Sequence, residues 1–268
     1  MIVNFKKMSA GALLALGGGV VFALFGMGIT AVQSVYWQQN VPAELWGVDN
    51  FTLGQYYFNH DDDSAGPYDL KKAQFFYERA IAENSAANNI LWYQSGRVDF
   101  INGDFDKALS KFQQQRTYFG DDIPNVYYMT GLTYAYRARQ TGSTENWKQA
   151  EIDFKKAVDF FYEAPWPYVD LAWVYFSQGK FDDMKSVLEK GLSYESNNPW
   201  LLNMYGLALL NTGDRELAHE YFLFAQEQAE KLTVEDWGNS YPGNDPNVWG
   251  AGLAEFKTLI NKNVLLSK

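Results

Sequence analysis

The chain has 268 residues, of which 47% are apolar and 17% aromatic, so it can build a continuous core and is not a disordered sequence. Its formal net charge of −10 argues against a general nucleic-acid-binding protein, because phosphate binding needs a basic surface. The chain has no cysteine, which excludes disulfides, thiolate metal sites and thiol catalysis.

A long apolar stretch near the N-terminus predicts a membrane-spanning helix. No charged residue occurs between residues 8 and 43, and residues 10–32 are mostly small or apolar. A helix of that length rises about 35 Å, enough to cross the hydrocarbon core of a bilayer. The alternative is a cleaved secretory signal, whose apolar region is usually only about 7–15 residues long. We therefore expect residues 1–33 to form a short tail and an uncleaved signal anchor.

The charges beside this stretch predict its orientation. Lys6 and Lys7 precede it, and the next basic residue is Lys71. Since basic residues stay on the cytoplasmic side, we expect a cytoplasmic N-terminus, a single span and a periplasmic or extracellular remainder. Trp37 and Trp46 follow the span and suit an interfacial aromatic belt.

Small residues recur along one face of the predicted span. They are Ala15, Gly19, Ala23 and Gly26. Faces of this kind let membrane helices approach closely, which indicates packing against another membrane protein. The alternative is that small residues are simply common in membrane spans. Residues 34–46 then form a linker, in which Pro42 discourages a continuous helix.

Residues 47–231 contain five copies of one pattern. In each copy a small residue is followed by an alanine-like position, and a large apolar residue comes one helical turn after that position. The copies are Gly54…Ala73-x3-Tyr77, Gly96…Ala108-x3-Phe112, Gly131…Ala150-x3-Phe154, Ala172…Met184-x3-Leu188 and Gly206…Ala218-x3-Phe222. The first small residues of copies two and three lie 35 residues apart, and those of copies four and five lie 34 apart. This pattern resembles the tetratricopeptide repeat family. The resemblance implies an all-α solenoid of five helix-turn-helix repeats that binds protein partners.

Two of the five copies are longer than the others. The spacing from the first small residue to the second is 12 in copies two, four and five, but 19 in copies one and three. We expect the seven extra residues to enlarge the same turn twice and to mark one edge of the solenoid. Arg137 and Lys148 flank the insertion in the third repeat, so this edge is a second candidate surface for partners.

Residues 232–268 follow the repeats and resemble a cap. A Gly-, Pro- and Asn-rich stretch predicts a loop, and Asp245-Pro246 predicts a helix start. The helix expected over residues 246–261 places Trp249, Leu253 and Phe256 along one face. We expect this helix to close the exposed end of the array.

We find no pattern that favours catalysis, a metal or a cofactor. Asp61 and Asp63 resemble the start of a calcium-binding loop, but Ala65 offers no side-chain oxygen and Lys72 stands where the bidentate glutamate belongs. A glycine-rich phosphate loop and a nucleophile elbow are both absent from the sequence. We therefore expect a protein that is not an enzyme.

The resemblance implies a concave groove built from the first helix of each repeat. Alignment of the repeats with one another places these residues there: Phe51, Gln55, Tyr93, Arg97, Tyr128, Leu132, Tyr136, Asp170, Trp173, Asn203 and Leu207. Such a lining is aromatic with few charges, and it suits an apolar peptide or helix. The alternative is that several of these side chains pack between helices.

Two functions fit these features. The first is a membrane-anchored scaffold or accessory subunit of a membrane or cell-envelope complex, which binds a membrane-embedded or envelope protein or a second copy of the chain. The second is a chaperone-like module that captures apolar or unfolded segments near the membrane.

Overall fold

The computed structural model describes residues 41–58, 67–84, 88–241 and 243–268. In these residues the regular structure is helical, and five consecutive pairs of antiparallel helices follow the five predicted repeats. The pairs are α2 (Asn50–Phe58) with α3 (Leu70–Asn84), α4 (Leu91–Asn102) with α5 (Phe105–Phe119), α6 (Pro124–Thr141) with α7 (Thr144–Phe160), α8 (Pro165–Ser177) with α9 (Phe181–Tyr194), and α10 (Pro199–Thr212) with α11 (Arg215–Glu230). The predicted all-α repeat architecture is confirmed.

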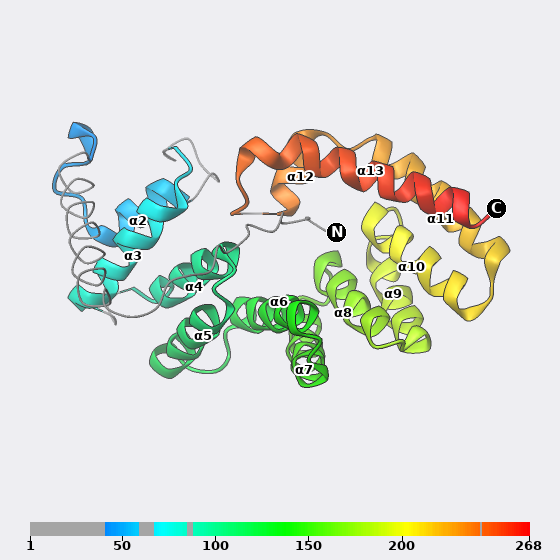
Figure 1. Cartoon of the computed structure of the whole chain (residues 1–268), viewed down its shortest axis with the longest axis horizontal. Coiled ribbons are helices and arrows are strands. Elements are labelled where there is room, and N and C mark those ends of the chain that lie inside the picture. Colours follow the sequence, from blue (N-terminus) through cyan, green and yellow to red (C-terminus); the bar gives the residue numbers. More distant parts are fainter. Residues whose placement is uncertain (1–40, 59–66, 85–87, 242) are drawn as a thin grey trace, which may run out of the picture.

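The helix pairs follow one another along a curved array (Figure 1). The first helices α4, α6, α8 and α10 lie on the inner side of the curve, and the second helices α5, α7 and α9 lie outside. Beyond α11 come α12 (Val234–Ser240), the short η2 (Pro246–Val248) and α13 (Trp249–Leu266). These last elements arch back over the inner side, toward the helices of the first repeats (Figure 1).

Local sequence signals set where the helices begin and end. Proline is the first residue of α6, α8 and α10, where its fixed φ suits a helix start and its missing N–H costs no helical hydrogen bond. Gly103 and Gly213 follow α4 and α10 in the left-handed conformation, which glycine adopts without strain. The turns from α4 to α5 and from α10 to α11 are therefore short.

A glycine facing an aromatic ring joins the two helices in four of the five repeats. A Cβ added to Gly206 would lie 2.6 Å from Cε1 of Phe222, which is fully buried. The same contact joins Gly54 to Tyr77, Gly96 to Phe112 and Gly131 to Phe154. The small residues of the repeated pattern thus lie where the two helices of a pair touch, and the aromatic residue packs on the glycine of its own repeat. In the fourth repeat, where Ala172 replaces the glycine, Leu188 replaces the ring.

The insertion in the third repeat lengthens helices, so the prediction of an enlarged turn was wrong there. Helix α6 has 18 residues and α7 has 17, against 12 and 15 in α4 and α5. Seven residues supply about two helical turns, so each helix can gain about one turn while the pair stays in register. The turn consists of Gly142 and Ser143. The insertion in the first repeat falls largely in residues 59–66, outside the described residues.

The segment after the repeats is more helical than its composition indicates. The segment predicted to be a loop forms helix α12 instead. A reciprocal capping box of Thr233 and Asp236 stabilises the start of this helix, and Trp237 is buried. Helix α13 begins at Trp249 and continues to Leu266, five residues beyond the predicted end. It buries Phe256 and Ile260 in a cluster with Ala225 and Ala229 of α11. The predicted packing of a C-terminal helix against the last repeat is confirmed.

The membrane-spanning prediction concerns residues that lie outside the described part of the chain. Ala15, Gly19, Ala23 and Gly26 belong to that segment, as do residues 34–40 of the predicted linker. Among the described helices, none combines the length and the apolar character needed to cross a membrane.

The glycine–ring contact makes a direct prediction for stability. We expect Gly206→Ala to lower the free energy of unfolding by about 1–3 kcal/mol, because the new methyl group overlaps the Phe222 ring. The control is Gly250→Ala in α13, where an added Cβ meets no atom within 4 Å. That variant should be neutral or slightly stabilised, since alanine favours helix more than glycine. Denaturant unfolding of both variants measures the difference, and equal stabilities would contradict the proposed contact.

Candidate interaction surface on the inner side of the array

A row of aromatic contacts connects the inner helices of repeats two to four. Tyr136 of α6 lies edge-on to Phe100 of α4 at 5.4 Å and to Trp173 of α8 at 5.3 Å between ring centroids. Trp173 also meets Trp147 of α7 edge-on at 5.5 Å. Edge-to-face contacts of this kind are favourable and directional. The predicted groove residues Tyr136 and Trp173 therefore contact each other across neighbouring repeats.

A hydrogen bond joins two further predicted groove residues. The hydroxyl of Tyr128 in α6 donates to Oδ2 of Asp170 in α8 at 2.7 Å. Its ring lies edge-on to Trp166 at a centroid distance of 4.3 Å. Leu132, one turn further along α6, packs against the core shared by repeats three to five and against the core shared by repeats two and three. These residues therefore form part of the joint between repeats three and four.

Burial shifts the protonation equilibria of this pair. It raises the pKa of Asp170 to about 6, although the hydrogen bond from Tyr128 acts in the opposite direction. Burial and the adjacent carboxylate raise the pKa of Tyr128, which stays neutral and can donate. Near neutral pH the carboxylate of Asp170 is thus a partly buried negative charge on an otherwise apolar surface.

The predicted groove residues of the first two repeats also pack against their neighbours. Gln55 accepts a hydrogen bond from the hydroxyl of Tyr77, and the ring of Phe51 lies 6.0 Å from that of Tyr77. Arg97 places its guanidinium 5.8 Å from the ring of Tyr93. All of these side chains except Tyr77 are partly exposed.

The last repeat differs, because the C-terminal helix covers its inner side. Asn203 is only 3% exposed, and its Oδ1 accepts a hydrogen bond from Nδ2 of Asn263 in α13 at 2.8 Å. Leu207 is partly buried against the same core as Val264 of α13. The structure therefore places Asn203 in a helix interface and away from an open groove.

A turn after α12 reaches the first two repeats, a contact that the sequence reasoning missed. The hydroxyl of Tyr68 donates to the carbonyl oxygen of Gly243 at 2.8 Å, across 175 residues of sequence. Tyr241 accepts a hydrogen bond from Nε1 of Trp200 at 3.0 Å. The aromatic residues that follow the repeats indicate that this segment packs against other parts of the chain. No sequence pattern indicates that its contact lies in the first repeat.

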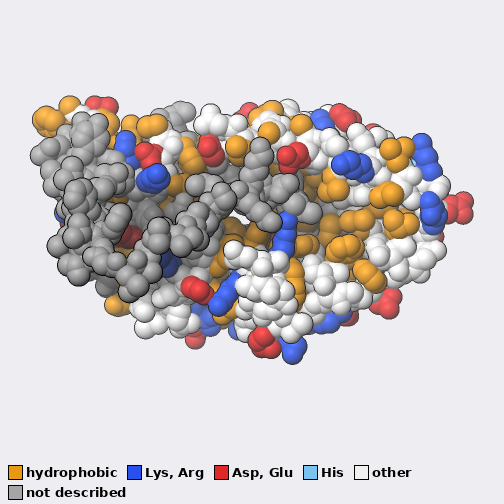
Figure 2. Space-filling view, in the orientation of Figure 1, with side chains coloured by type: hydrophobic (Ala, Val, Ile, Leu, Met, Phe, Trp, Pro, Cys, Tyr) orange, Lys and Arg blue, Asp and Glu red, His pale blue; other side chains and the backbone are white. Residues whose placement is uncertain are grey.

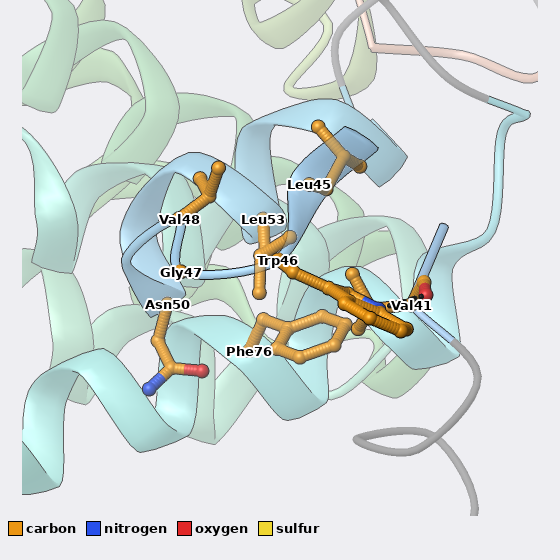
Figure 3. A pocket seen from close by; sticks show the side chains of 8 residues that line it. All are labelled: Val41, Leu45, Trp46, Gly47, Val48, Asn50, Leu53 and Phe76. Atoms are coloured by element: carbon orange, nitrogen blue, oxygen red, sulfur yellow. Dashed lines mark hydrogen bonds between the residues drawn. The ribbon is translucent and has the colours of Figure 1, made fainter. Parts of the chain in front are cut away.

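A small cavity lies at the start of the described array (Figure 3). Its volume is about 240 Å³. Its lining residues are Val41, Leu45, Trp46, Gly47, Val48, Asn50, Leu53 and Phe76. The indole of Trp46, which is 74% exposed, lies beside Val41 and Phe76 and donates to the carbonyl oxygen of Val41 at 3.0 Å. Most of the lining residues are apolar, and none of them is titratable.

One buried charge pair connects the first two repeats. Asp99 of α4 is fully buried, and its Oδ2 lies 2.7 Å from Nζ of Lys111 in α5. Its Oδ1 accepts a hydrogen bond from Nε2 of Gln74 in α3 at 3.1 Å. Burial raises the pKa of Asp99 although Lys111 favours its ionised form. The pair connects three helices inside the array.

Charge is dispersed on the face that Figure 2 shows. Acidic and basic side chains are scattered over this face, some of them near its centre, and hydrophobic side chains gather between α10 and α13.

The raised pKa of Asp170 predicts a pH dependence of stability. The ordinary pKa is 3.8, and in the folded chain it is about 6. The folded state therefore binds the Asp170 proton more tightly than the unfolded state does. As the pH rises between these two pKa values, the free energy of unfolding falls by about 1–3 kcal/mol. Asp170→Asn keeps an acceptor for Tyr128 but cannot ionise.

Thermal unfolding of both proteins between pH 4 and 7.5 measures this effect. We expect the melting temperature of Asp170→Asn, relative to the unaltered chain, to rise by several degrees across the window. A difference that stays constant with pH would contradict the burial of this carboxyl group.

Known proteins resemble this chain in fold. No protein-family model and no curated protein matches the sequence. Among solved structures, the chain resembles TTC0263, a thermophilic TPR protein of Thermus thermophilus, with a TM-score of 0.53 and 18% identity over 73% of this chain and 91% of that one. It also resembles MamA, at 0.53 and 21% identity over 61% and 90%. MamA of Desulfovibrio magneticus gives 0.53 and 14% identity over 61% and 87%. The chain therefore has the tetratricopeptide-repeat fold.

Proposed function

We propose that this protein is a non-enzymatic scaffold that binds an apolar segment of a protein partner on the inner side of its repeats. The observation that carries the proposal is the row formed by Phe100, Tyr136 and Trp173, whose rings meet edge-on along three repeats and are only partly buried. Phe176, one turn beyond Trp173 in α8, is 40% exposed. Rigid aromatic side chains of this kind supply binding energy with little loss of conformational freedom.

The fold supports this proposal. Stacked helix pairs create an extended curved surface, and repeat proteins use such surfaces for binding. An amphipathic helix or an extended segment with apolar anchors fits a row of aromatic contacts. Since the row spans neighbouring repeats, a partner helix that lies along it can place anchors at helical spacing against successive repeats.

We further propose that the N-terminal segment anchors the array in a membrane. The apolar residues 10–32, the preceding Lys6 and Lys7, and the small-residue face with Gly19 support this proposal. The partner is then a membrane-embedded or envelope protein, and the chain acts as an accessory subunit that holds it at the surface.

The chaperone-like function remains the second candidate. The exposed aromatic and aliphatic side chains on the inner side and between α10 and α13 favour it, because unfolded segments bind to such surfaces with little selectivity. Purification of the full chain in mild detergent separates the two functions. A partner in fixed stoichiometry supports the scaffold, and a heterogeneous set of weakly bound proteins supports the chaperone.

The binding proposal predicts the effect of removing the aromatic anchors. We expect Trp173→Ala combined with Phe176→Ala to reduce recovery of the co-purifying partner at least tenfold, because both are aromatic residues of the inner helix α8 that are not fully buried. The matched control is Tyr162→Ala combined with Tyr194→Ala, two exposed aromatic residues outside the first helices of the repeats. Circular dichroism must show folded arrays for both variants. Equal recovery from the two would refute the proposed surface.

The anchoring proposal predicts which side of the membrane holds the repeats. The chain has no cysteine, so Ser143→Cys in the turn between α6 and α7 introduces a unique thiol. We expect a membrane-impermeant maleimide to label this thiol in intact cells or spheroplasts. Labelling only after lysis would show that the proposed orientation is wrong.

A further inference from the structure

One carboxyl group lies among aromatic side chains where repeats three and four meet. Asp170 of α8 comes one turn after Trp166 and one turn before Trp173, so the three residues share a face of the helix. On the neighbouring inner helix α6 (Figure 1), Tyr128 lies edge-on to Trp166 at 4.3 Å, and Tyr136 lies edge-on to Trp173 at 5.3 Å. The carboxyl group therefore lies between two aromatic pairs, one on each side of it along α8.

The protonation equilibria of two tyrosines also place them near this carboxyl group. Burial raises the pKa of Tyr136, and the charge of Asp170 raises it further. Burial likewise raises the pKa of Tyr241, which follows α12, and Asp170 again adds to the shift. All three side chains are partly exposed, so the group is accessible from the inner side.

The charge of Asp170 has no basic partner among the described residues. The hydroxyl of Tyr128 donates to Oδ2, and no lysine or arginine of the described ranges forms an ion pair with the carboxylate. Arg139 at the end of α6 lowers the pKa of Tyr136 but does not pair with Asp170. Burial opposes ionisation of this group and raises its pKa to about 6. An opposite charge would stabilise the carboxylate, and the described part of the chain does not supply one.

Two other carboxylates of the array show what a paired charge looks like in this chain. Asp99, which is fully buried, has Nζ of Lys111 at 2.7 Å. Glu151, which is largely buried, has Nζ of Lys180 at 2.6 Å from the next repeat. Asp170 differs from both, because its closest neighbours are aromatic rings and a neutral hydroxyl.

An aromatic lining around one carboxylate suits a cationic side chain. The faces of Trp and Tyr rings attract the cations of lysine and arginine, and the attraction is stronger where water is excluded. The carboxylate adds a charge-assisted hydrogen bond, and the apolar stem of the same side chain can lie against the rings. The net charge of −10 also favours the approach of a basic partner.

We propose that the inner side binds one lysine or arginine side chain of the partner segment at Asp170. The rings that line this site are Tyr128, Tyr136, Trp166 and Trp173. The inference rests on the proposed function and makes it more specific, because the partner is then an apolar segment with a basic residue opposite the fourth repeat. The hydrogen bond from Tyr128 occupies Oδ2 and leaves Oδ1 to accept from the cation.

Peptide selection tests this preference without knowledge of the partner. The probe is a displayed library of random peptides, selected against the immobilised full chain in mild detergent, against Asp170→Asn and against Asp182→Asn. Asparagine keeps an acceptor for Tyr128, so the joint between the repeats is retained. Asp182→Asn is the matched control, since it removes an exposed carboxylate from the outer helix α9.

We expect the parent chain and Asp182→Asn to enrich lysine or arginine at one position, next to apolar residues. Asp170→Asn should select apolar peptides without this basic residue. The site would be overturned by parent-selected peptides that lack a basic preference, by a preference that Asp170→Asn retains, or by a selection that enriches no peptide.

A binding cycle separates a cation site from a purely structural role of Asp170. The probes are the tightest selected peptide and its analogue with norleucine in place of the basic residue, both measured by fluorescence anisotropy. For the parent chain the analogue should bind about tenfold more weakly, and for Asp170→Asn the two peptides should bind about equally. If Asp170 only holds Tyr128 in the joint, Asp170→Asn weakens both peptides by the same factor, and this result would refute the site.

The proposed function and the cation site can fail separately. The proposed function fails if Trp173→Ala with Phe176→Ala retains the partner. The cation site alone fails if that variant loses the partner while the peptides selected by the parent chain need no basic residue.

Discussion

The close approach of a glycine to an aromatic ring is the constraint on which the array depends. It brings the two helices of a repeat together, as at Gly96 with Phe112 and at Gly206 with Phe222, where a Cβ would lie 2.6 Å from the ring. A rigid pair then presents its first helix to the inner side and its second helix to the outer side. Because each pair packs only on its neighbours, the same contact repeated sets the curvature of the whole.

The aromatic row on the inner side follows from this arrangement. Once the pairs are fixed, Tyr136 and Trp173 on successive first helices are held within 5.3 Å of each other. The proposed binding surface and the structural joint are thus the same residues, and in the proposed function a partner meets side chains whose positions are already fixed. Such preorganisation reduces the ordering cost of binding. The Gly243 turn adds a contact of a different kind, since it joins the first repeat to the segment that follows the fifth repeat.

The sequence alone predicted the features that depend on contacts between residues close together in the chain. The five repeats and the spacing of their small and aromatic positions were predicted correctly, because each signal lies within about 35 residues of its partner. The insertion in the third repeat was misassigned to the turn, since spacing alone cannot tell a longer loop from two longer helices. The helix around Trp237 was missed because glycine and asparagine obscured the capping box of Thr233. Asn203 was placed in an open groove because its cover, α13, comes 60 residues later. The contact between Tyr68 and Gly243 has no local signal at all.

The central claim is that a partner binds on the inner side of the array, and site-specific photocrosslinking in cells tests it most directly. A benzophenone amino acid replaces Phe176 on the inner helix α8, or Tyr162 in the loop after α7, and both positions are exposed. The account predicts one discrete crosslinked partner from position 176 and none from position 162. The same adduct from position 162, with none from position 176, would contradict it.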